Sequence, residues 1–248
     1  MMSDHRIGSR ASDEEVAGGR RSAALTGAIA GFVLPIGLIA TLSVVSGYQG
    51  NYIPGVDAPR RDFVRFYTDN FSRIRVTSTM FILLSVLVLV VIVAVVRAAA
   101  PHAGLLGIVA ITLAGASTAV SVAVQALFVS PTVVLEMTGQ NLPRNLDPGV
   151  ARFLVLAADG APNAAGVLIG VALILMAVLL VRGDLWGHWV LGITAALMGA
   201  VGVVNMVIGG AGNYMVGMIP WGLLAGFILL VARLRLGRTA DNSTVVNG

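Results

Sequence analysis

The sequence lacks cysteine and lysine entirely, and its 16 basic residues are all arginines. Without cysteine the chain cannot form disulfides, thiolate metal sites, iron–sulfur clusters or a cysteine nucleophile. The three histidines, His5, His102 and His188, lie far apart, which excludes a histidine-rich metal box and an HExxH protease motif. The phosphate-binding pattern G-x-x-x-x-G-K-[ST] is also missing. We therefore predict no catalytic residue, no bound metal and no cofactor.

Charge is scarce and is absent from long stretches of the chain. Charged residues make up 11% of the sequence and hydrophobic residues 57%, whereas soluble domains carry roughly 25% charged residues. Six runs contain no ionisable side chain: residues 23–46, 76–96, 104–129, 164–181, 189–208 and 214–232. A helix rising ~1.5 Å per residue needs about 20 residues to cross a hydrocarbon core of ~30 Å. The sequence therefore predicts an all-α polytopic membrane bundle with six transmembrane helices in residues 22–235, a disordered N-terminal tail (1–21) and a C-terminal tail (236–248).

The arginines gather at the ends of the apolar runs. Arg21, Arg97, Arg182 and Arg233 each adjoin one end of a run, which is typical of charges that set membrane topology. If both termini are cytoplasmic, nine arginines lie inside and seven outside. We therefore expect a multi-pass protein of the cell membrane with both termini in the cytoplasm. Because the arginines form no compact face, the net charge of +4 indicates the lipid bilayer, and not nucleic acid, as the partner.

The loop before the second run has a helical periodicity of its own. Its apolar side chains recur three and four residues apart, so they share one helix face and leave the arginines on the others. One interpretation is an interfacial helix that binds anionic lipid, which would favour the reverse orientation in the membrane. The other is a short amphipathic helix that caps the bundle. The residues concerned are Arg60, Arg61, Phe63, Arg65, Phe66, Tyr67, Phe71 and Arg73.

The loop at residues 130–163 contains a helix start at Asp147-Pro148, with Asp as the cap and Pro in the first turn. We expect a helix from Pro148 to about residue 158, interrupted at residues 159–163 before the fourth apolar run. Two interpretations remain open. The helix either lies on the surface and ends in a turn, or it is part of a broken helix that marks a binding site.

Neutral polar side chains lie within the spans, where no ionisable group occurs. Ser117, Ser121 and Gln125 recur every four residues and share one face of the third span, while Asn205 lies in the fifth. They could line a path for a ligand, or they could hydrogen-bond between helices, with Gln125 and Asn205 as a candidate pair. The lack of ionisable groups argues against a proton-driven antiporter.

Glycines recur four residues apart at Gly27 and Gly31, at Gly166 and Gly170, and at Gly222 and Gly226. This spacing lets helix backbones approach closely. It would suit contacts within one chain or between protomers, so a homo-oligomer is a further expectation.

Three segments carry a resemblance to a known family. They are Arg20-Arg21-Ser22-Ala23, Phe71-Ser72-Arg73-Ile74-Arg75, and Val181-Arg182-Gly183-Asp184-Leu185-Trp186-Gly187-His188-Trp189-Val190-Leu191-Gly192. On these residues the chain resembles a bacterial family of six-pass integral membrane proteins classed as a domain of unknown function. The chain departs from that family at Gly187-His188, where Pro-Arg is expected. The resemblance covers residues 20–235 and implies a fold without implying an active site.

Three functional hypotheses remain. The leading one is a non-enzymatic integral membrane protein that binds a lipid-like molecule or assists a membrane-protein partner. The alternative is a small-molecule transporter or channel with a neutral polar lining. An intramembrane enzyme would need loop carboxylates such as Asp159 and Asp184, together with further groups that the sequence does not identify.

Overall fold

The computed structural model describes residues 4–47, 53–99, 104–138, 146–183, 185–208 and 211–245. The regular secondary structure in these ranges is helical: α1 (Asp4–Ser46), α2 (Arg60–Ala99), α3 (Gly104–Thr138), α5 (Pro148–Val181), α6 (His188–Ile208) and α7 (Ala211–Val245). Each predicted apolar run lies within one of these helices. The predicted all-α class is confirmed.

The helices have the length and surface of membrane spans. Five of them, α1, α2, α3, α5 and α7, contain a stretch long and apolar enough to cross a membrane, while the apolar part of α6 described here is shorter. Large apolar side chains point outward, such as Ile36, Leu105 and Leu197, which are 69%, 77% and 62% exposed. Such a surface is unfavourable in water and favourable in lipid. The architecture is that of a multi-pass membrane protein.

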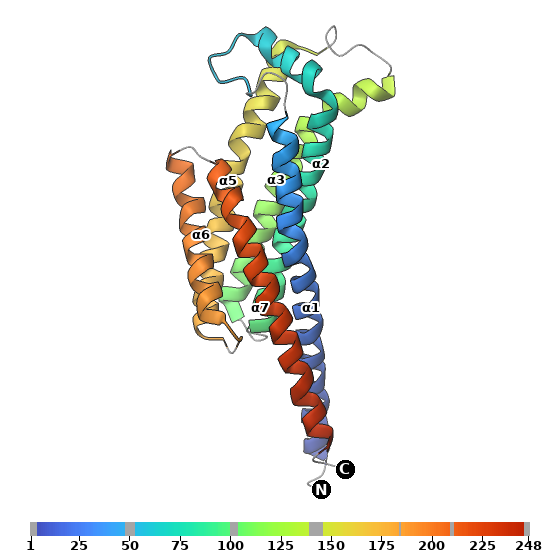
Figure 1. The fold of residues 1–248 in the computed structure, drawn as a ribbon, viewed down its shortest axis with the longest axis vertical. Coiled ribbons are helices and arrows are strands. Elements are labelled where there is room, and N and C mark those ends of the chain that lie inside the picture. Colours follow the sequence, from blue (N-terminus) through green and yellow to red (C-terminus); the bar gives the residue numbers. More distant parts are fainter. Residues whose placement is uncertain are drawn as a thin grey trace.

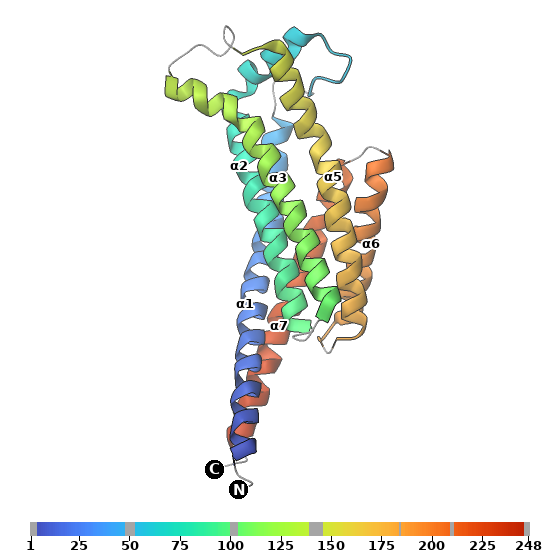
Figure 2. The same ribbon diagram turned by 180° about the vertical axis from the view of Figure 1, so that it is seen from behind.

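The bundle is organised around α2, which contacts α1, α3 and α5, while α7 packs on α1 and α6 packs on α5. Both chain termini lie at one end, here called the terminal end, and the opposite end is called the distal end (Figures 1 and 2). At the distal end, α2 and α5 extend beyond α6 and α7 (Figure 1). The two ends of the molecule therefore differ in construction.

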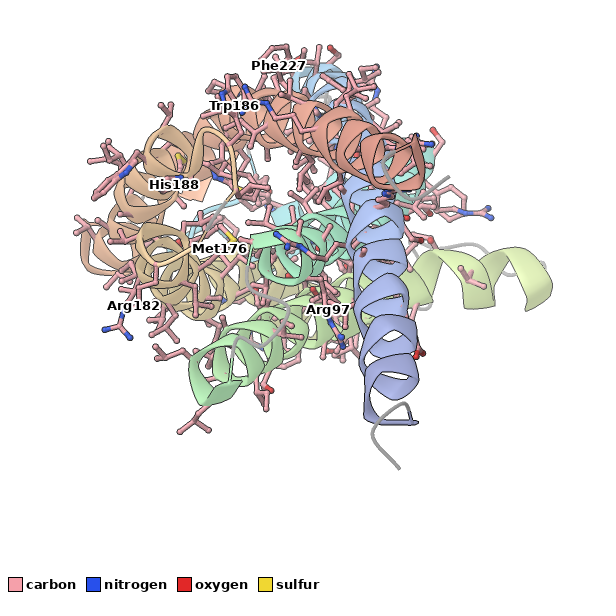
Figure 3. The ribbon with its side chains drawn as sticks, turned by 90° about the horizontal axis from the view of Figure 1, so that it is seen from below. Arg97, Met176, Arg182, Trp186, His188 and Phe227 are labelled. Carbon is pink, nitrogen blue, oxygen red and sulfur yellow. The ribbon has the colours of Figure 1, made fainter. Side chains whose placement is uncertain are left out.

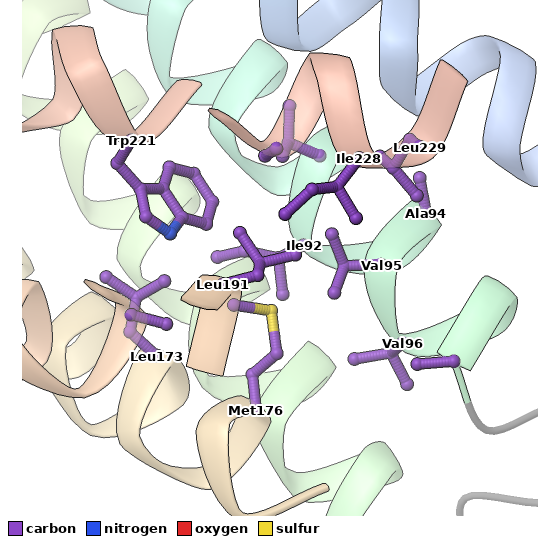
Figure 4. Packing of buried hydrophobic residues seen from close by; sticks show 14 of the residues in the cluster. Ile92, Ala94, Val95, Val96, Leu173, Met176, Leu191, Trp221, Ile228 and Leu229 are labelled. Atoms are coloured by element: carbon purple, nitrogen blue, oxygen red, sulfur yellow. The ribbon is translucent and has the colours of Figure 1, made fainter. Parts of the chain in front are cut away.

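The core lies where α2, α5, α6 and α7 meet. Figure 4 shows Ile92 of α2 among Met176 of α5, Leu191 of α6 and Ile228 of α7. These four side chains are at most 2% exposed. Because lipid is as apolar as these side chains, close van der Waals packing holds the helices together more than the hydrophobic effect does.

Glycines make the closest helix contacts. A Cβ atom built on Gly31 of α1 would lie 2.7 Å from the Cα of Gly226 in α7. One built on Gly170 of α5 would lie 2.6 Å from the carbonyl oxygen of Gly199 in α6. The glycine spacing predicted to bring backbones together therefore joins α1 to α7 and α5 to α6 within one chain. The expected homo-oligomer stays a prediction.

The amphipathic segment predicted as a separate short helix is instead the first part of α2. That helix continues from Arg60 to Ala99, through the predicted junction with the second span. Ile74, Thr77 and Ser78 at this junction are all buried. Packing against the neighbouring helices therefore supports one continuous helix across it.

The start of α5 agrees with the prediction. The Asp147 carboxylate accepts hydrogen bonds from the backbone N–H groups of Gly149 and Val150, at 2.8 and 3.0 Å. Pro148 occupies the first turn, where its missing N–H costs nothing. The side-chain cap and the proline together fix where the helix begins.

The predicted interruption at residues 159–163 is wrong, because α5 runs without a break from Pro148 to Val181. Val155 and Ala165, on either side of the predicted break, are both buried. Tertiary packing on both sides overrides the local turn signals. A broken helix therefore does not mark a binding site in this segment.

Both chain ends are helical where the sequence indicates tails. α1 begins at Asp4 and α7 continues to Val245. The two helices extend side by side beyond the rest of the bundle at the terminal end (Figures 1 and 2). Because extending an existing helix costs far less than starting one, the two spans continue into polar sequence.

Candidate functional site

Basic and aromatic side chains gather at the terminal end. Figure 3, which looks onto this end, labels Arg97, Arg182, Trp186 and His188. The Arg235 guanidinium lies over the Trp186 ring, 5.1 Å from its centroid, and Trp186 meets the Phe227 ring edge-on. Trp186 and Trp189 are 40% and 57% exposed. Amphipathic tryptophans and arginines at one level are typical of a membrane–water interface.

Two arginines of α1 tie three helices together at this level. Arg20 donates from Nε and Nη2 to the carbonyl oxygen of Ala98, at 3.1 and 2.9 Å. Ala98 lies in the last turn of α2, where carbonyls lack partners within the helix and the helix dipole favours positive charge. Arg21 donates from Nη2 to the carbonyl oxygen of Leu236 in α7. These bonds hold α1 against both neighbouring helices.

Next to Arg20, a groove of about 760 Å³ runs between α1 and α2. Its walls are one face of each helix, since the lining residues of α1 and of α2 recur at spacings of three and four residues. Ser22, Thr26 and Arg97 are among its exposed members, so the groove opens on the outer surface of the bundle. The lining consists of Glu15, Val16, Gly19, Arg20, Ser22, Ala23 and Thr26 of α1 and Leu89, Val90, Val93, Ala94 and Arg97 of α2.

The groove changes in character along its length. From Thr26 and Leu89 toward the terminal end it is uncharged, until it reaches Arg20 and Arg97. Arg20 uses two of its N–H donors on Ala98, and a guanidinium has about five, so donors remain for a ligand. Arg97 forms no ion pair with any described side chain. The groove can therefore accept an amphiphile whose apolar part lies along α2 and whose anionic group meets two guanidiniums.

The predicted polar lining of α3 is partly engaged in helix contacts. Ser117 donates to the carbonyl oxygen of Ala165 in α5 at 2.8 Å. Its neighbour Thr118 donates to the carbonyl oxygen of Ser85 in α2 at 3.2 Å. Ser117 therefore hydrogen-bonds between helices, the second of its two predicted roles.

The other members of the lining are placed less completely. Gln125 is buried and Ser121 is half-buried on α3. Asn205 lies on α6, but its side chain is outside the described residues. α5 lies between α3 and α6 (Figure 2). The pairing of Gln125 with Asn205 stays a prediction.

Buried hydroxyl groups that the sequence did not single out lie closer to the distal end. Thr77 Oγ1 and Ser78 Oγ have no hydrogen-bond partner within the described part of the chain. They lie about 20 residues from Arg97 on α2, which is about one hydrocarbon thickness. The two hydroxyls are therefore expected near the distal limit of the membrane-spanning part of α2.

The aromatic face of the segment at residues 60–74 is buried. Tyr67 donates from its hydroxyl to the carbonyl oxygen of Phe128 in α3 at 3.0 Å, and the two rings lie 5.4 Å apart. Phe71 packs at the edge of the same cluster. The buried members are Phe63, Phe66, Tyr67, Ile74, Phe128, Ala151, Leu154 and Val155. The aromatic rings therefore face α3 and α5, as in a cap on the bundle, and do not face lipid headgroups.

The arginines of this segment lie on its outer faces. Arg60 and Arg61 are exposed, and Arg65 pairs with Asp69 one turn away at 3.3 Å. Arg73 lies against Gly47 at the end of α1. Exposed pairs of this kind contribute about 1 kcal/mol or less. They form a solvated surface around the buried aromatic cluster.

An intramembrane enzyme was expected to need loop carboxylates such as Asp159 and Asp184. Asp184 and the side chain of Asp159 lie outside the described residues. Within the described ranges, no three His, Cys, Asp or Glu side chains converge as metal ligands would.

No protein-family model, curated protein or solved structure matches this chain. The groove between α1 and α2 was not predicted from the sequence, in which Arg97 is interpreted as a topology signal and Arg20 only as part of the family resemblance. The available signal was the stripe Glu15, Gly19, Ser22 and Thr26, whose small and polar members leave one side of α1 open. That stripe does not indicate which part of α2 lies opposite it.

Proposed function

We propose that this chain is a non-enzymatic, multi-pass protein of the cell membrane that binds a phosphate-bearing lipid in the groove between α1 and α2. The observation that carries the proposal is the order of side chains along the groove, in which an apolar floor leads to two guanidiniums. A guanidinium matches a phosphate with parallel hydrogen bonds, and the apolar floor suits an acyl chain.

The two arginines suit this task because they approach from different helices. Arg20 is held in place by its two bonds to Ala98, so less side-chain freedom is lost when a ligand binds. Arg97 comes from α2 and lines the same groove; Figure 3 shows it beside α1. One phosphate between them would connect α1 and α2.

We also propose that both termini are cytoplasmic. The supporting observation is that Arg20, Arg97, Arg182 and Arg235 all lie at the terminal end, within about a turn of the predicted span ends. Positive charge next to spans is favoured on the cytoplasmic side.

The lipid proposal is tested by purifying the protein in a mild detergent and counting retained phospholipid by native mass spectrometry. We expect Arg97→Gln to retain at least about tenfold less phospholipid, since a hydrogen bond to a charged group contributes ~1.5–3 kcal/mol. Arg182→Gln is the matched control, because it removes an exposed arginine of the same end that is outside the groove lining.

A second pair of variants tests the apolar floor. Val93→Trp would fill the groove and displace the acyl chain, whereas Ile108→Trp introduces the same large side chain on an exposed part of α3. Equal retention by the native chain, Arg97→Gln and Val93→Trp would overturn the proposal. Crosslinking from the groove to a protein would support the membrane-partner hypothesis in its place.

A second candidate is a small-molecule transporter or channel with a neutral polar lining. It is favoured by the buried hydroxyls of Thr77 and Ser78 on α2, which have no hydrogen-bond partner among the described residues. Solute flux into proteoliposomes should then fall in Gln125→Ala and Asn205→Ala. Flux that survives both substitutions would remove this candidate site.

A further inference from the structure

The groove contains a carboxylate in addition to its two guanidiniums. Glu15 is exposed and lines the groove on the terminal side of Arg20. The two residues are five positions apart, which is about 7.5 Å along the axis of α1. Along the helix axis toward the terminal end, the groove lining is therefore first apolar, then positively charged, and then negatively charged.

Glu15 is not neutralised by the arginines it accompanies. Side chains meet on a helix at separations of three or four residues, whereas Glu15 and Arg20 are five apart. The Arg20 guanidinium is also turned toward Ala98. In the described part of the chain, Glu15 forms no ion pair. Its carboxylate is therefore available to a cation at the mouth of the groove.

This order of charges matches one class of membrane lipid. In an aminophospholipid the acyl chains are followed by the phosphate and then by a primary ammonium. We infer that the groove selects a zwitterionic aminophospholipid over an anionic phospholipid, with the phosphate at Arg20 and Arg97 and the ammonium at Glu15. The inference rests on the proposed function, because it requires a phospholipid in the groove.

The selection follows from hydrogen bonding at Glu15. A primary ammonium can donate charge-assisted hydrogen bonds to a carboxylate. A glycerol headgroup carries no positive charge. An anionic lipid therefore brings its phosphate charge toward the Glu15 carboxylate with no ammonium to offset the repulsion. Glu15 therefore acts as the specificity residue, whereas Arg97 supplies binding to either lipid.

The test uses the full chain in nanodiscs that contain dioleoyl phosphatidylethanolamine and dioleoyl phosphatidylglycerol in equal amounts. Native mass spectrometry measures both the total phospholipid that stays bound and the ratio of the two headgroups. For the native chain we expect about fivefold enrichment of phosphatidylethanolamine, the size of one partly exposed ion pair. Glu15→Gln should bring the ratio close to one and leave the total unchanged.

Glu14→Gln is the matched control, since it makes the same change of charge about 100° around the helix. Its headgroup ratio should equal that of the native chain. A ratio that Glu15→Gln does not change, with total binding still dependent on Arg97, would overturn this inference alone. Total binding that is also independent of Arg97 would overturn the proposed function with it.

Discussion

Gly31 and Gly226 lie back to back where α1 crosses α7, so closely that a Cβ atom on Gly31 would approach the Gly226 Cα to 2.7 Å. The same Cβ would lie 2.9 Å from the carbonyl oxygen of Gly222. Both neighbours are backbone atoms, which cannot rotate out of the way as the end of a side chain can. The contact therefore depends on the absence of a side chain at this position.

Gly31→Ala should destabilise the bundle by about 1–3 kcal/mol, the usual cost of forcing extra atoms into a packed contact. This outweighs the gain of ~1 kcal/mol in helix propensity from Gly to Ala. The measurement is thermal unfolding in detergent, followed by circular dichroism. Gly115→Ala is the control, because a Cβ there meets nothing within 4 Å. A midpoint for Gly31→Ala at or above that of the control would contradict the close crossing.

Tyr67→Phe should lower the free energy of unfolding by about 1 kcal/mol, because the Phe128 carbonyl loses its buried donor while the ring contact remains. Thr68→Ala removes a hydroxyl that bonds within its own helix on an exposed face. Its effect should stay within about 0.5 kcal/mol. Equal effects of the two substitutions would show that the stability of the buried aromatic cluster around Tyr67 does not depend on the Tyr67 hydroxyl.

Arg20→Gln should lower the free energy of unfolding in lipid-free detergent by about 1.5–3 kcal/mol, because two charge-assisted hydrogen bonds to Ala98 are lost. Arg20→Lys keeps the charge but lacks the fork of donors, so its loss should be intermediate. Arg233→Gln, at an exposed position of the same end, serves as the control. If the lysine variant is as unstable as the glutamine variant, the stabilisation depends on the donor geometry of the guanidinium and not on its charge. If both variants keep full stability, the hydrogen bonds of Arg20 do not stabilise the bundle.

The orientation can be measured directly because the native chain contains no cysteine. Ser72→Cys places an exposed thiol near the distal end, and Gly18→Cys places one on α1 where a Cβ meets nothing within 4 Å. A membrane-impermeant maleimide should label Ser72→Cys in intact cells and Gly18→Cys only after permeabilisation. The opposite pattern would put both termini outside.

The spans were predictable because each depends on a local property, the length of an uncharged apolar run. The start of α5 was predictable for the same reason, since Asp147 and Pro148 act within one turn. The predicted break at residues 159–163 was wrong because α5 is packed against other helices on both sides of it, at Val155 and Ala165. A local turn signal could not include those contacts.

The groove could not be predicted because it depends on the register between two helices. Arg20 and the Ala98 carbonyl that it binds are 78 residues apart in the chain. No periodicity within α1 indicates which residues of α2 lie opposite it. The buried hydroxyls of Thr77 and Ser78 were not predicted for a related reason. They lie at the very start of the predicted span, which begins at residue 76, and their burial depends on neighbouring helices.

Arg20 both joins α1 to α2 and lines the groove between them. A ligand that takes up its remaining donors would bind the assembled helix pair and not the separated helices. Binding of that kind is thermodynamically linked to folding and adds ~2.7 kcal/mol of stability when the ligand is present at one hundred times its dissociation constant. The melting temperature of the protein would then report the headgroup composition of the surrounding membrane.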